Sequence, residues 1–408
     1  MTNRQAAIDI VRRLQGEGYQ ALLAGGCVRD MLLGRRPNDY DIATNARPED
    51  VMRLFPRTWK VGAKFGVVIV LTRRTQVEVA TFRAEAGYQD GRHPDQVTFT
   101  NAAADASRRD FTINGMFYDP VAEQVIDYVS GQADLAKRIL RTIGDPEERF
   151  GEDYLRMLRA IRFSTQLDFP IERKTFAAIR GNAARITHIS GERIAIELEA
   201  ILVHPDRQRG SSMLLDSGLA KAIFPALPSG DGRRALGVLG GLRKRVDGAL
   251  ALAAFFSDCA AEAALEQCSI LKPSRNRTKH LGFLLNHRGC LLDDGMSLAS
   301  LKKLLAKPYF WDLYELERAT HKADDDAAAL ASLARLRRRV RALRGVNVKP
   351  KPLLNGHDLI RLGATGGPEV GQLAEEMYIA QLEGQLHTTE QAEQWVGQWL
   401  QRHRAGEQ

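Results

Sequence analysis

The point at which strand-forming sequence stops is the feature that most constrains the fold. Short segments rich in β-branched residues, separated by turn residues, lie in the first third of the chain, at 40–44, 66–72, 76–83 and 123–129. From Arg149 onward, apolar residues recur with a helical period and no strand pattern returns. The sequence therefore predicts an α+β fold, in which a small mixed sheet with helices is followed by an all-helical remainder.

Proline and glycine mark the joints of this remainder. Asp145-Pro146, Pro205 and the stretch 225–232 interrupt the helical pattern. A chain of 408 residues is long enough for two to four domains. The predicted segments are a head at 1–148, a helical neck at 149–204, a helical body at 205–345 and a helical tail at 346–408.

Charge and cysteine content narrow the cellular setting. The formal net charge is +8 and the isoelectric point is about 9.3, which permits nucleic acid as a partner. The four cysteines match no zinc-binding spacing, so free thiols in a reducing cytoplasm are expected. No apolar run is long enough for a membrane span, and the N-terminal stretch lacks a signal-peptide core. We expect a cytoplasmic protein without a membrane segment, and no stretch indicates a stable protein partner.

Two aspartates flank a tyrosine in the segment GGCVRDMLLGRRPNDYDIAT, residues 25–44. On a strand, Asp39 and Asp41 would project from the same face, because side chains alternate with a period of two. Two carboxylates held that close repel unless a cation lies between them. The alternative is an ordinary solvated turn, since Asn38 and Asp39 follow Pro37. This segment alone does not decide between the two.

A third carboxylate and a glycine pair favour the metal hypothesis. Glu78 lies on another predicted strand of the head, and three carboxylates suit Mg²⁺, which prefers oxygen ligands. Gly25 and Gly26 allow a phosphate to approach the backbone closely, and Arg29 can neutralise that phosphate. The combination predicts phosphoryl or nucleotidyl transfer, with these carboxylates as the catalytic groups.

These motifs resemble those of the class II tRNA nucleotidyltransferases, the superfamily of bacterial CCA-adding enzymes and bacterial poly(A) polymerases. The resemblance runs from about Tyr19 to Leu202. Its four segments are 25–44, RRDFTIN at 108–114, EDYLRMLRAIRF at 152–163 and SGERIAIEL at 190–198. The resemblance implies a nucleotidyltransferase head with Mg²⁺ as cofactor.

The resemblance also implies roles for individual residues. Asp39 and Asp41 would be the metal ligands, and Glu78 the third carboxylate. Arg109 and Asp110 would contact sugar and phosphate and organise the junction of head and neck. The other implied residues are Gly25, Gly26, Arg29 and Asn114 at the nucleotide, and Glu192 and Arg193 in the last motif.

The segment 152–163 predicts how a base is chosen without a nucleic-acid template. Asp153, Arg156 and Arg159 recur every three residues along one helix face, with Arg162 next; the alternative is a solvated charged stripe. Asp153 would accept from an exocyclic amino group while Arg156 donates to the ring nitrogen. Cytosine and adenine fit this pair, whereas uracil and guanine do not. The predicted substrates are therefore CTP and ATP, with Arg159 and Arg162 at the triphosphate or ribose.

Four functions fit the motifs to different degrees. A CCA-adding enzyme, a relative that adds the terminal A or CC alone, and a poly(A) polymerase share the head; a non-catalytic RNA-binding protein would keep the head as a relic. The stretch 82–99 resembles the flexible loop that lets family members switch from C to A, which argues against CC addition alone. The segment 190–198 is closer to CCA-type and A-adding sequences than to poly(A) polymerases. We expect addition of the A or CCA end of tRNA from ATP and CTP, with release of pyrophosphate.

The last part of the chain offers weaker signals. Six arginines between 335 and 344 suit an RNA phosphate rail, although a solvated helix face is the alternative; the candidates are Arg335, Arg337, Arg338 and Arg339. Gly366-Gly367-Pro368 predicts a helix start. His357-Asp358, Cys27 and His188 are expected to have structural roles.

Overall fold

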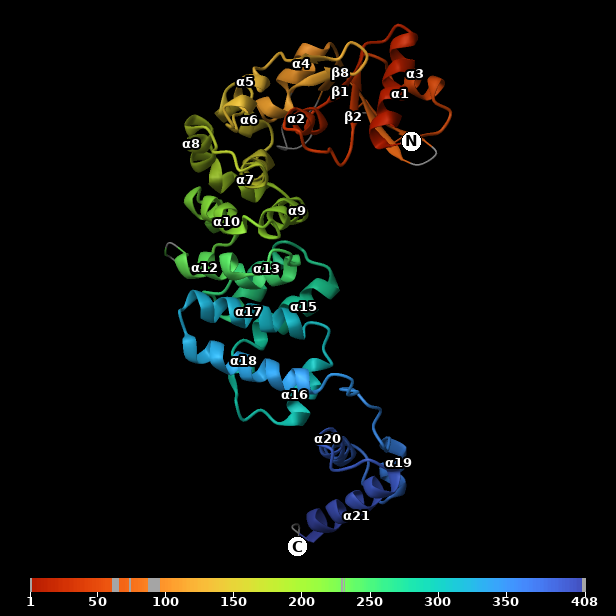
Figure 1. Ribbon diagram of the computed structural model, residues 1–408, viewed down its shortest axis with the longest axis vertical. Helices are drawn as coiled ribbons and strands as arrows, with labels where there is room; N and C mark the ends of the chain where they lie inside the picture. Colours follow the sequence, from red (N-terminus) through yellow and green to blue (C-terminus); the bar gives the residue numbers. More distant parts are fainter. Residues whose placement is uncertain are drawn as a thin grey trace. The chain divides into compact units, whose positions relative to one another are not determined.

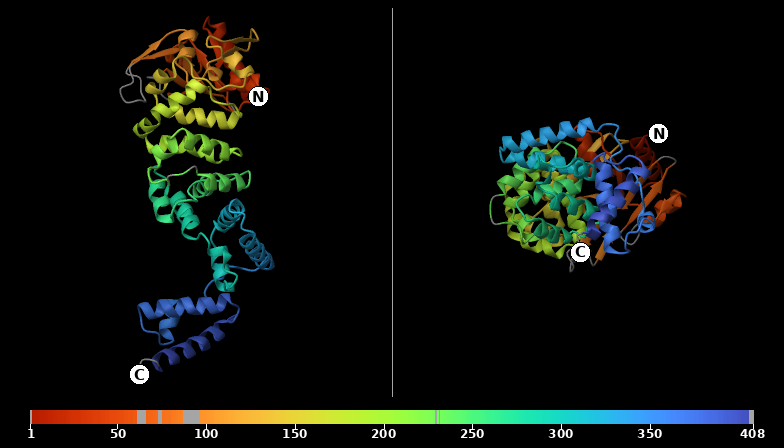
Figure 2. Two further views of the ribbon diagram at one scale, coloured as in Figure 1. Left: turned by 90° about the vertical axis from the view of Figure 1, so that its left-hand side faces the viewer. Right: turned by 90° about the horizontal axis from the view of Figure 1, so that it is seen from below.

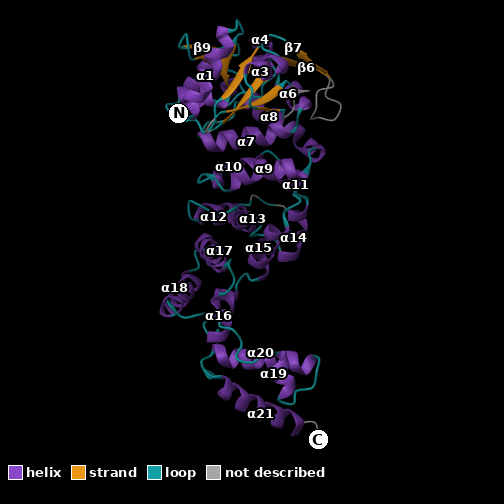
Figure 3. Cartoon of the chain, turned by 90° about the vertical axis from the view of Figure 1, so that its right-hand side faces the viewer, coloured by secondary structure: helices purple, strands orange, loops and turns teal. Residues whose placement is uncertain are grey.

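The computed structural model describes residues 2–60, 66–72, 75–86, 96–228, 230 and 232–405. The chain forms two compact units. The first comprises Met1–Leu236 and Glu266–Pro273, and the second comprises Gly237–Leu265 and Ser274–Gln408. All strands in the described part of the chain belong to the first unit, as the orange arrows of Figure 3 show. The predicted α+β class is confirmed.

A mixed sheet forms the centre of the head. Its seven strands follow the order β3-β4-β5-β2-β1-β8-β9, and β2 with β5 is the parallel pair in this sheet. Figure 1 labels β1, β2 and β8 near the middle of the head. The elements are α1 (Asn3–Gly16), β1 (Ala21–Ala24), α2 (Gly26–Leu32), β2 (Asp41–Thr44), α3 (Pro48–Leu54), β3 (Thr58–Trp59), β4 (Val67–Leu71), β5 (Gln76–Thr81), β6 (Arg83–Ala86), β7 (Gln96–Phe99), α4 (Ala102–Ser107), η2 (Thr112–Asn114), β8 (Phe117–Asp119), β9 (Gln124–Ile126) and α5 (Gly131–Ala136).

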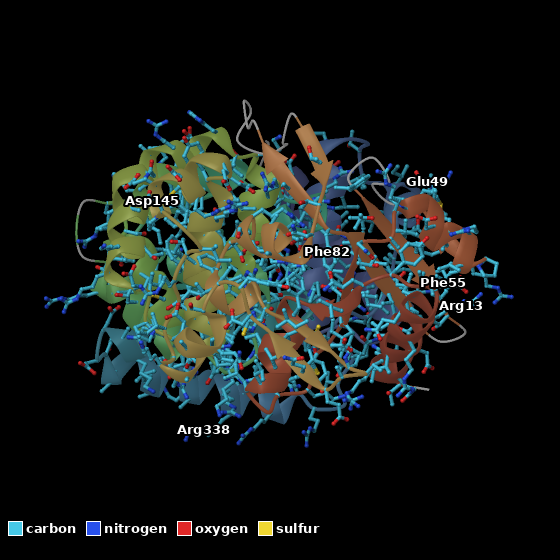
Figure 4. The ribbon with its side chains drawn as sticks, turned by 90° about the horizontal axis from the view of Figure 1, so that it is seen from above. Arg13, Glu49, Phe55, Phe82, Asp145 and Arg338 are labelled. Atoms are coloured by element: carbon cyan, nitrogen blue, oxygen red, sulfur yellow. The ribbon has the colours of Figure 1, made fainter. Side chains whose placement is uncertain are left out.

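Helix α1 covers one face of this sheet, as its apolar spacing predicts. Ile10, Val11 and Leu14 are buried, and the helix packs against β1, β2 and β5. At its outer edge the Arg13 guanidinium lies 5.3 Å from the ring centre of Phe55, a neighbouring pair in Figure 4.

The opposite face carries a second apolar cluster. Leu22, Ala24 and Ala43 project there, in keeping with the strand period of two. Phe82 and Phe117 meet edge to face with ring centres 5.8 Å apart; Phe82 is labelled near the centre of Figure 4. The buried sheet fixes the strand ends from which the polar residues described below project.

In the segment 107–119 the structure differs from what the sequence predicts. The sequence predicts a helix through this stretch toward a strand, but α4 ends at Ser107 and Arg108 is its C-terminal cap. Phe111 is extended and bridges Thr142, and the short 3₁₀ helix η2 follows. Tertiary pairing of Phe111 therefore overrides the helical pattern.

Helices alone continue the first unit beyond the head, as predicted from the sequence. Helix α7 packs against α9 and α10, and α6 packs against α8. The helices are α6 (Pro146–Glu152), α7 (Leu155–Leu167), α8 (Arg173–Asn182), η3 (Ala183–His188), α9 (Gly191–Leu202), α10 (Arg207–Asp216) and α11 (Leu219–Ile223); α12 (Arg233–Gly241) and α14 (Ala261–Ser269) run from one unit into the other.

The second unit is helical where the structure describes it. Its last three helices, blue in Figure 2, surround their own apolar cluster, which includes Leu373, Met377 and Trp399. None of the described helices is long and apolar enough to span a membrane. The remaining elements are α13 (Gly248–Phe255), α15 (Arg275–Asn286), η4 (Cys290–Leu292), α16 (Leu298–Leu305), α17 (Phe310–Ala323), α18 (Ala327–Ala342), α19 (Gly356–Arg361), α20 (Pro368–Leu382) and α21 (Thr389–Ala405).

The weaker structural expectations have clear outcomes. Cys27 is buried, and burial raises the pKa of its thiol to about 12, in keeping with a packing role. Asp358 caps α19 and pairs with Arg361 at 2.8 Å. His188 is exposed, yet its ring meets that of Tyr154 edge to face. Pro368 begins α20, as predicted.

Candidate active site between head and neck

A cavity of about 660 Å³, called the junction cavity below, opens between the head and helix α7 of the same unit. Eight arginines and five carboxylates are among its lining residues, so its walls are positive overall. It collects fourteen residues that the sequence singles out: Gly25, Gly26, Arg29, Asp39, Asp41, Glu78, Arg109, Asp110, Asn114, Asp153, Arg156, Arg159, Arg162 and Arg193.

The glycine pair forms the turn from β1 into α2. Gly25 has φ +74°, which favours glycine, and a Cβ there would lie 2.9 Å from Arg109 Nη1. Arg29, on α2, is buried, and its Nη1 donates to Asn114 Oδ1 at 2.7 Å. The turn and two arginines therefore converge on one wall, an arrangement suited to an anionic group.

The three carboxylates lie at the ends and middle of neighbouring strands. Asp41 begins β2 and Glu78 lies in β5, its parallel neighbour, while Asp39 precedes β2 and is not part of the strand. Burial, Glu78 and Asp39 raise the pKa of Asp41 to about 6, and Arg109 opposes this shift. The side chain nevertheless opens onto the cavity. The site thus holds a concentration of negative charge that a cation would relieve.

These three carboxylates do not form a closed protein cage for a cation. The three do not form a group with all ligand atoms within 4.8 Å of one another; the described residues contain such a group elsewhere. Mg²⁺ usually keeps several waters and takes one or two carboxylates together with substrate phosphates. The open carboxylate set beside an arginine-rich wall matches that donor pattern.

The tighter group lies in the second unit and consists of Asp247, His280 and Asp312. The Nδ1 atom of His280 lies 3.3 Å from Asp247, and its Nε2 atom lies 3.2 Å from Asp312. Arg243 also pairs with Asp312 at 2.5 Å. The two ring nitrogens face different carboxylates, so His280 links the N-terminal cap of α13 to α17 through polar contacts.

Asp110 ties the head to α7 through Arg159. Their closest atoms are 2.6 Å apart, and Asp110 is buried. Burial alone would raise the pKa of Asp110, but Arg159 and the hydrogen bonds of Arg159 and Asn114 lower it to about 2. Arg162 pairs in turn with Glu197 at 2.6 Å. Both arginines predicted for the triphosphate or ribose thus have carboxylate partners inside the protein, although both line the cavity.

Asp153 corrects the prediction of one continuous helix face. It is the C-terminal cap of α6, with extended backbone, and α7 begins two residues later. Its carboxylate accepts from Arg193 Nη2 at 2.7 Å and from the Leu155 amide at 3.0 Å. Arg156 instead pairs with Glu152 and donates to a backbone carbonyl. Asp153 and Arg156 still line the same cavity.

The last sequence motif divides into two roles. Arg193 lines the cavity and holds Asp153, whereas Glu192 is exposed, pairs with Lys272 at 3.0 Å and does not line the cavity. The pKa of Glu192 is lowered by backbone hydrogen bonding and by Lys272. The motif therefore contributes one cavity residue.

Sequence reasoning missed three residues of the cavity wall. Arg83 and Arg108 line it, and Arg108 pairs with Asp105 at 2.7 Å. Phe163 lies under three guanidinium groups, those of Arg29, Arg159 and Arg162, at 5.4, 5.3 and 4.1 Å. Arg108 and Phe163 stand inside the quoted motifs, and Arg83 stands at the start of the stretch 82–99, so their positions offered a signal.

Two further predictions have different outcomes. Of the stretch 82–99, residues 87–95 lie outside the described residues, so its switching role stays a prediction.

On α18, Arg335 pairs with Asp294 at 2.5 Å and Arg339 donates to the Met296 carbonyl at 2.5 Å. Arg337 and Arg338, the latter labelled in Figure 4, are exposed and have no ion pair with a described residue.

Comparisons with known proteins place this geometry in context. Residues 21–141 match the family described as "Poly A polymerase head domain", and residues 168–229 match "Probable RNA and SrmB- binding site of polymerase A". A "CCA-adding enzyme" of Geobacillus sp. is 46% identical over 216 residues, 53% of each chain, so that match spans about half the length of the relative. A "CCA-adding enzyme" of Lactobacillus johnsonii is 34% identical over 95% of each chain.

A solved structure matches the whole chain. It is the crystal structure of Bacillus stearothermophilus CCA-adding enzyme in complex with CTP, with a TM-score of 0.80 and 31% identity. The match covers 100% of this chain and 99% of that one.

Proposed function

The chain belongs to the CCA-adding enzyme family, and from this premise we propose that it adds the 3′-terminal CCA to tRNA from CTP and ATP, without a nucleic-acid template and with release of pyrophosphate. The observation that carries the proposal is the junction cavity, which brings the Gly25-Gly26 turn, the three carboxylates and the pair of Asp153 and Arg156 into one space. The four free cysteines support a reducing cytoplasm as the proposed location.

The proposed chemistry begins with Asp39 and Asp41. With Glu78 nearby, they would hold Mg²⁺, which supplies activation of the attacking 3′-hydroxyl and neutralisation of the leaving pyrophosphate when bound. The Gly25-Gly26 turn, Arg29 and Arg109 would orient the triphosphate from the facing wall.

Base choice is proposed to rest on Asp153 and Arg156. Asp153 accepts from the amino group of cytosine or adenine, and Arg156 donates to the ring nitrogen beside it. Arg193 holds the Asp153 carboxylate from behind at 2.7 Å and orients it. Arg159 and Asp110 keep α7 fixed against the head, so the base-choosing residues stay at the catalytic wall.

The test uses three tRNA substrates, which end before CCA, after C and after CC. Each is incubated with the purified protein and one nucleotide at a time. CCA addition predicts incorporation of C on the first two substrates and of a single A on the third. A protein that adds A to the third substrate alone is an A-adding enzyme, and one that extends it with many A residues is a poly(A) polymerase. Either result would replace the proposal.

A further inference from the structure

A second cavity, of about 540 Å³, shares two chain segments with the junction cavity but takes alternate side chains from them. In α2, Arg29 lines the junction cavity, whereas Val28 and Met31 line the second. Between residues 39 and 41, the two aspartates line the junction cavity and Tyr40 lines the second. The same elements thus separate two distinct spaces in the head.

The second cavity is positively charged without internal compensation. Arg4, from the first turn of α1, and Arg35 and Arg36, which follow α2, line it, and none of its described lining residues is a carboxylate. All three are exposed, and none forms an ion pair or side-chain hydrogen bond with a described residue. Surface arginines are common, but three around one hollow create a field that attracts an anion, and guanidinium groups match phosphate geometry.

Aromatic and apolar groups complete the wall. Tyr40 and Tyr118 line the cavity beside Val28, Met31 and Pro37. Tyr40 is buried, so its ring forms part of the closed side of this cavity.

We propose that this cavity binds a nucleotide unit, with the phosphate held by Arg4, Arg35 and Arg36 and the base against the tyrosines and apolar side chains. Its volume lies within the ~300–1,000 Å³ typical of small-ligand sites. Arginine next to aromatic faces is the combination with which proteins hold single nucleotides and unpaired RNA. The nucleotide comes either from the free pool or from a single-stranded RNA segment. The site is separate from the junction cavity, and the proposal does not depend on tRNA end addition.

Photo-crosslinking with 8-azido-AMP in the presence of EDTA tests the site in the full-length protein. The labelled residues, assigned by mass spectrometry, should include Met31, Tyr40 or Tyr118. Arg4→Ala/Arg36→Ala should lower this label by about tenfold, the effect of losing charge-assisted contacts to phosphate. The matched control is Arg12→Ala/Arg57→Ala, which removes two exposed arginines of the same unit that line neither cavity. The control should retain the label.

Competition identifies the source of the nucleotide. Loss of most of the label with unlabelled AMP in large excess over the probe supports a free nucleotide, whereas loss with a ten-nucleotide single-stranded RNA at a concentration where AMP leaves the label supports an RNA segment. Inorganic phosphate that competes as well as AMP would overturn the proposal, as would equal labelling of Arg4→Ala/Arg36→Ala and wild type. If the double variant melts at a lower temperature, the single exposed variant Arg36→Glu is judged by the same criteria. Labelling of Arg156 and its neighbours in the junction cavity reports separately on the proposed function.

Discussion

Burial, together with the nearby Glu78 and Asp39, raises the pKa of Asp41 to about 6, so its ionised form gains from a bound cation. Asp41→Ala should lower nucleotide incorporation by roughly 10³-fold or more, because several kcal/mol of transition-state stabilisation are lost with the metal ion. Binding of tRNA should change by less than about twofold, since phosphate contacts elsewhere determine it. Single-turnover incorporation and filter binding measure the two effects. Glu49→Ala, on the exposed side of α3 in Figure 4, is the control, and near-normal turnover of Asp41→Ala would refute the metal assignment.

Arg156 tests base choice. In Arg156→Ala, Asp153 still requires an amino group but nothing opposes the ring N–H of uracil or guanine. The activation free energy for incorporation of C and A should rise by ~1–3 kcal/mol, the value of a lost buried hydrogen bond. Discrimination against UTP and GTP should fall at the same time. Incorporation assays with each of the four triphosphates measure both.

Arg149 provides the matched control for this prediction. It pairs with the same Glu152 at 2.9 Å but does not line the cavity. Arg149→Ala should therefore slow all nucleotides alike. If Arg156→Ala also slows all four by one common factor, Arg156 does not read the base.

The buried pair of Asp110 and Arg159 predicts a dependence of stability on pH. The pKa of Asp110 lies at about 2, below its ordinary value of 3.8, so its ionised form stabilises the fold. At pH values above the ordinary pKa, the ionised form contributes about 2 kcal/mol to the free energy of unfolding. This contribution is lost as pH falls from ~4 to ~2. Urea unfolding of wild type and Asp110→Asn should give a difference in free energy that is constant from pH 5 to 7 and shrinks below pH 4. A constant difference at all pH values would contradict the assignment.

At the scale of elements, the arginines of helix α18 fall into two groups: some have partners within the protein and others are exposed to solvent. Arg335 and Arg339 are held by Asp294 and the Met296 carbonyl, whereas Arg337 and Arg338 are exposed and are the candidates for a phosphate contact. Arg337→Ala/Arg338→Ala should weaken tRNA binding and reduce the slope of log K against log salt by up to about 2, one for each lost phosphate contact. Fluorescence anisotropy at several salt concentrations measures the slope.

The control for α18 comes from the same helix. Arg339→Ala should lower the unfolding free energy, because it removes a donor to a backbone carbonyl, and should leave the salt slope unchanged. An unchanged slope in Arg337→Ala/Arg338→Ala would show that this face is merely solvated.

The local spacing of apolar and β-branched residues predicted most elements of the head and the helical character of the remainder. It did not predict where the helices end. The strands β2, β4 and β5 follow from β-branched runs, and α1 follows from its apolar spacing. The break at Asp153 does not, because the group that holds its carboxylate, Arg193, lies forty residues away in sequence. The same limit hid the partners of Arg159 and Arg162. Motif spacing predicted which residues gather at the cavity, whereas ion-pair partners depend on tertiary contacts.

At the scale of the whole molecule, the chain does not divide into consecutive segments. Residues Glu266–Pro273 return to the first unit after the second has begun. Gln267 accepts from the Ala226 amide at 3.1 Å, and Lys272 pairs with Glu192 at 3.0 Å. No sequence pattern predicts that this segment packs within the first unit, since the packing depends on contacts across about forty to eighty residues. The predicted bounds at 148, 204 and 345 therefore stay predictions.

Gly191 is where this returning segment is packed most tightly. A Cβ at Gly191 would overlap the carbonyl oxygen of Ile270, a backbone atom that cannot rotate away. Alanine has the higher helix propensity, so a change at the start of α9 would otherwise be neutral or stabilising. Gly191→Ala should instead lower the unfolding free energy by ~1–3 kcal/mol, the usual cost of overpacking.

Urea unfolding of full-length protein measures this effect, with Gly181→Ala as the matched control. In α8 a Cβ at Gly181 would meet nothing closer than Glu147 Oε1 at 3.8 Å, so this variant should gain ~0.5–1 kcal/mol. Because α9 also carries Arg193, displacement of its first turn should loosen Asp153 and weaken discrimination between CTP and UTP in Gly191→Ala but not in Gly181→Ala. Equal stability of the two variants would mean that residues 266–273 do not pack on α9 in solution.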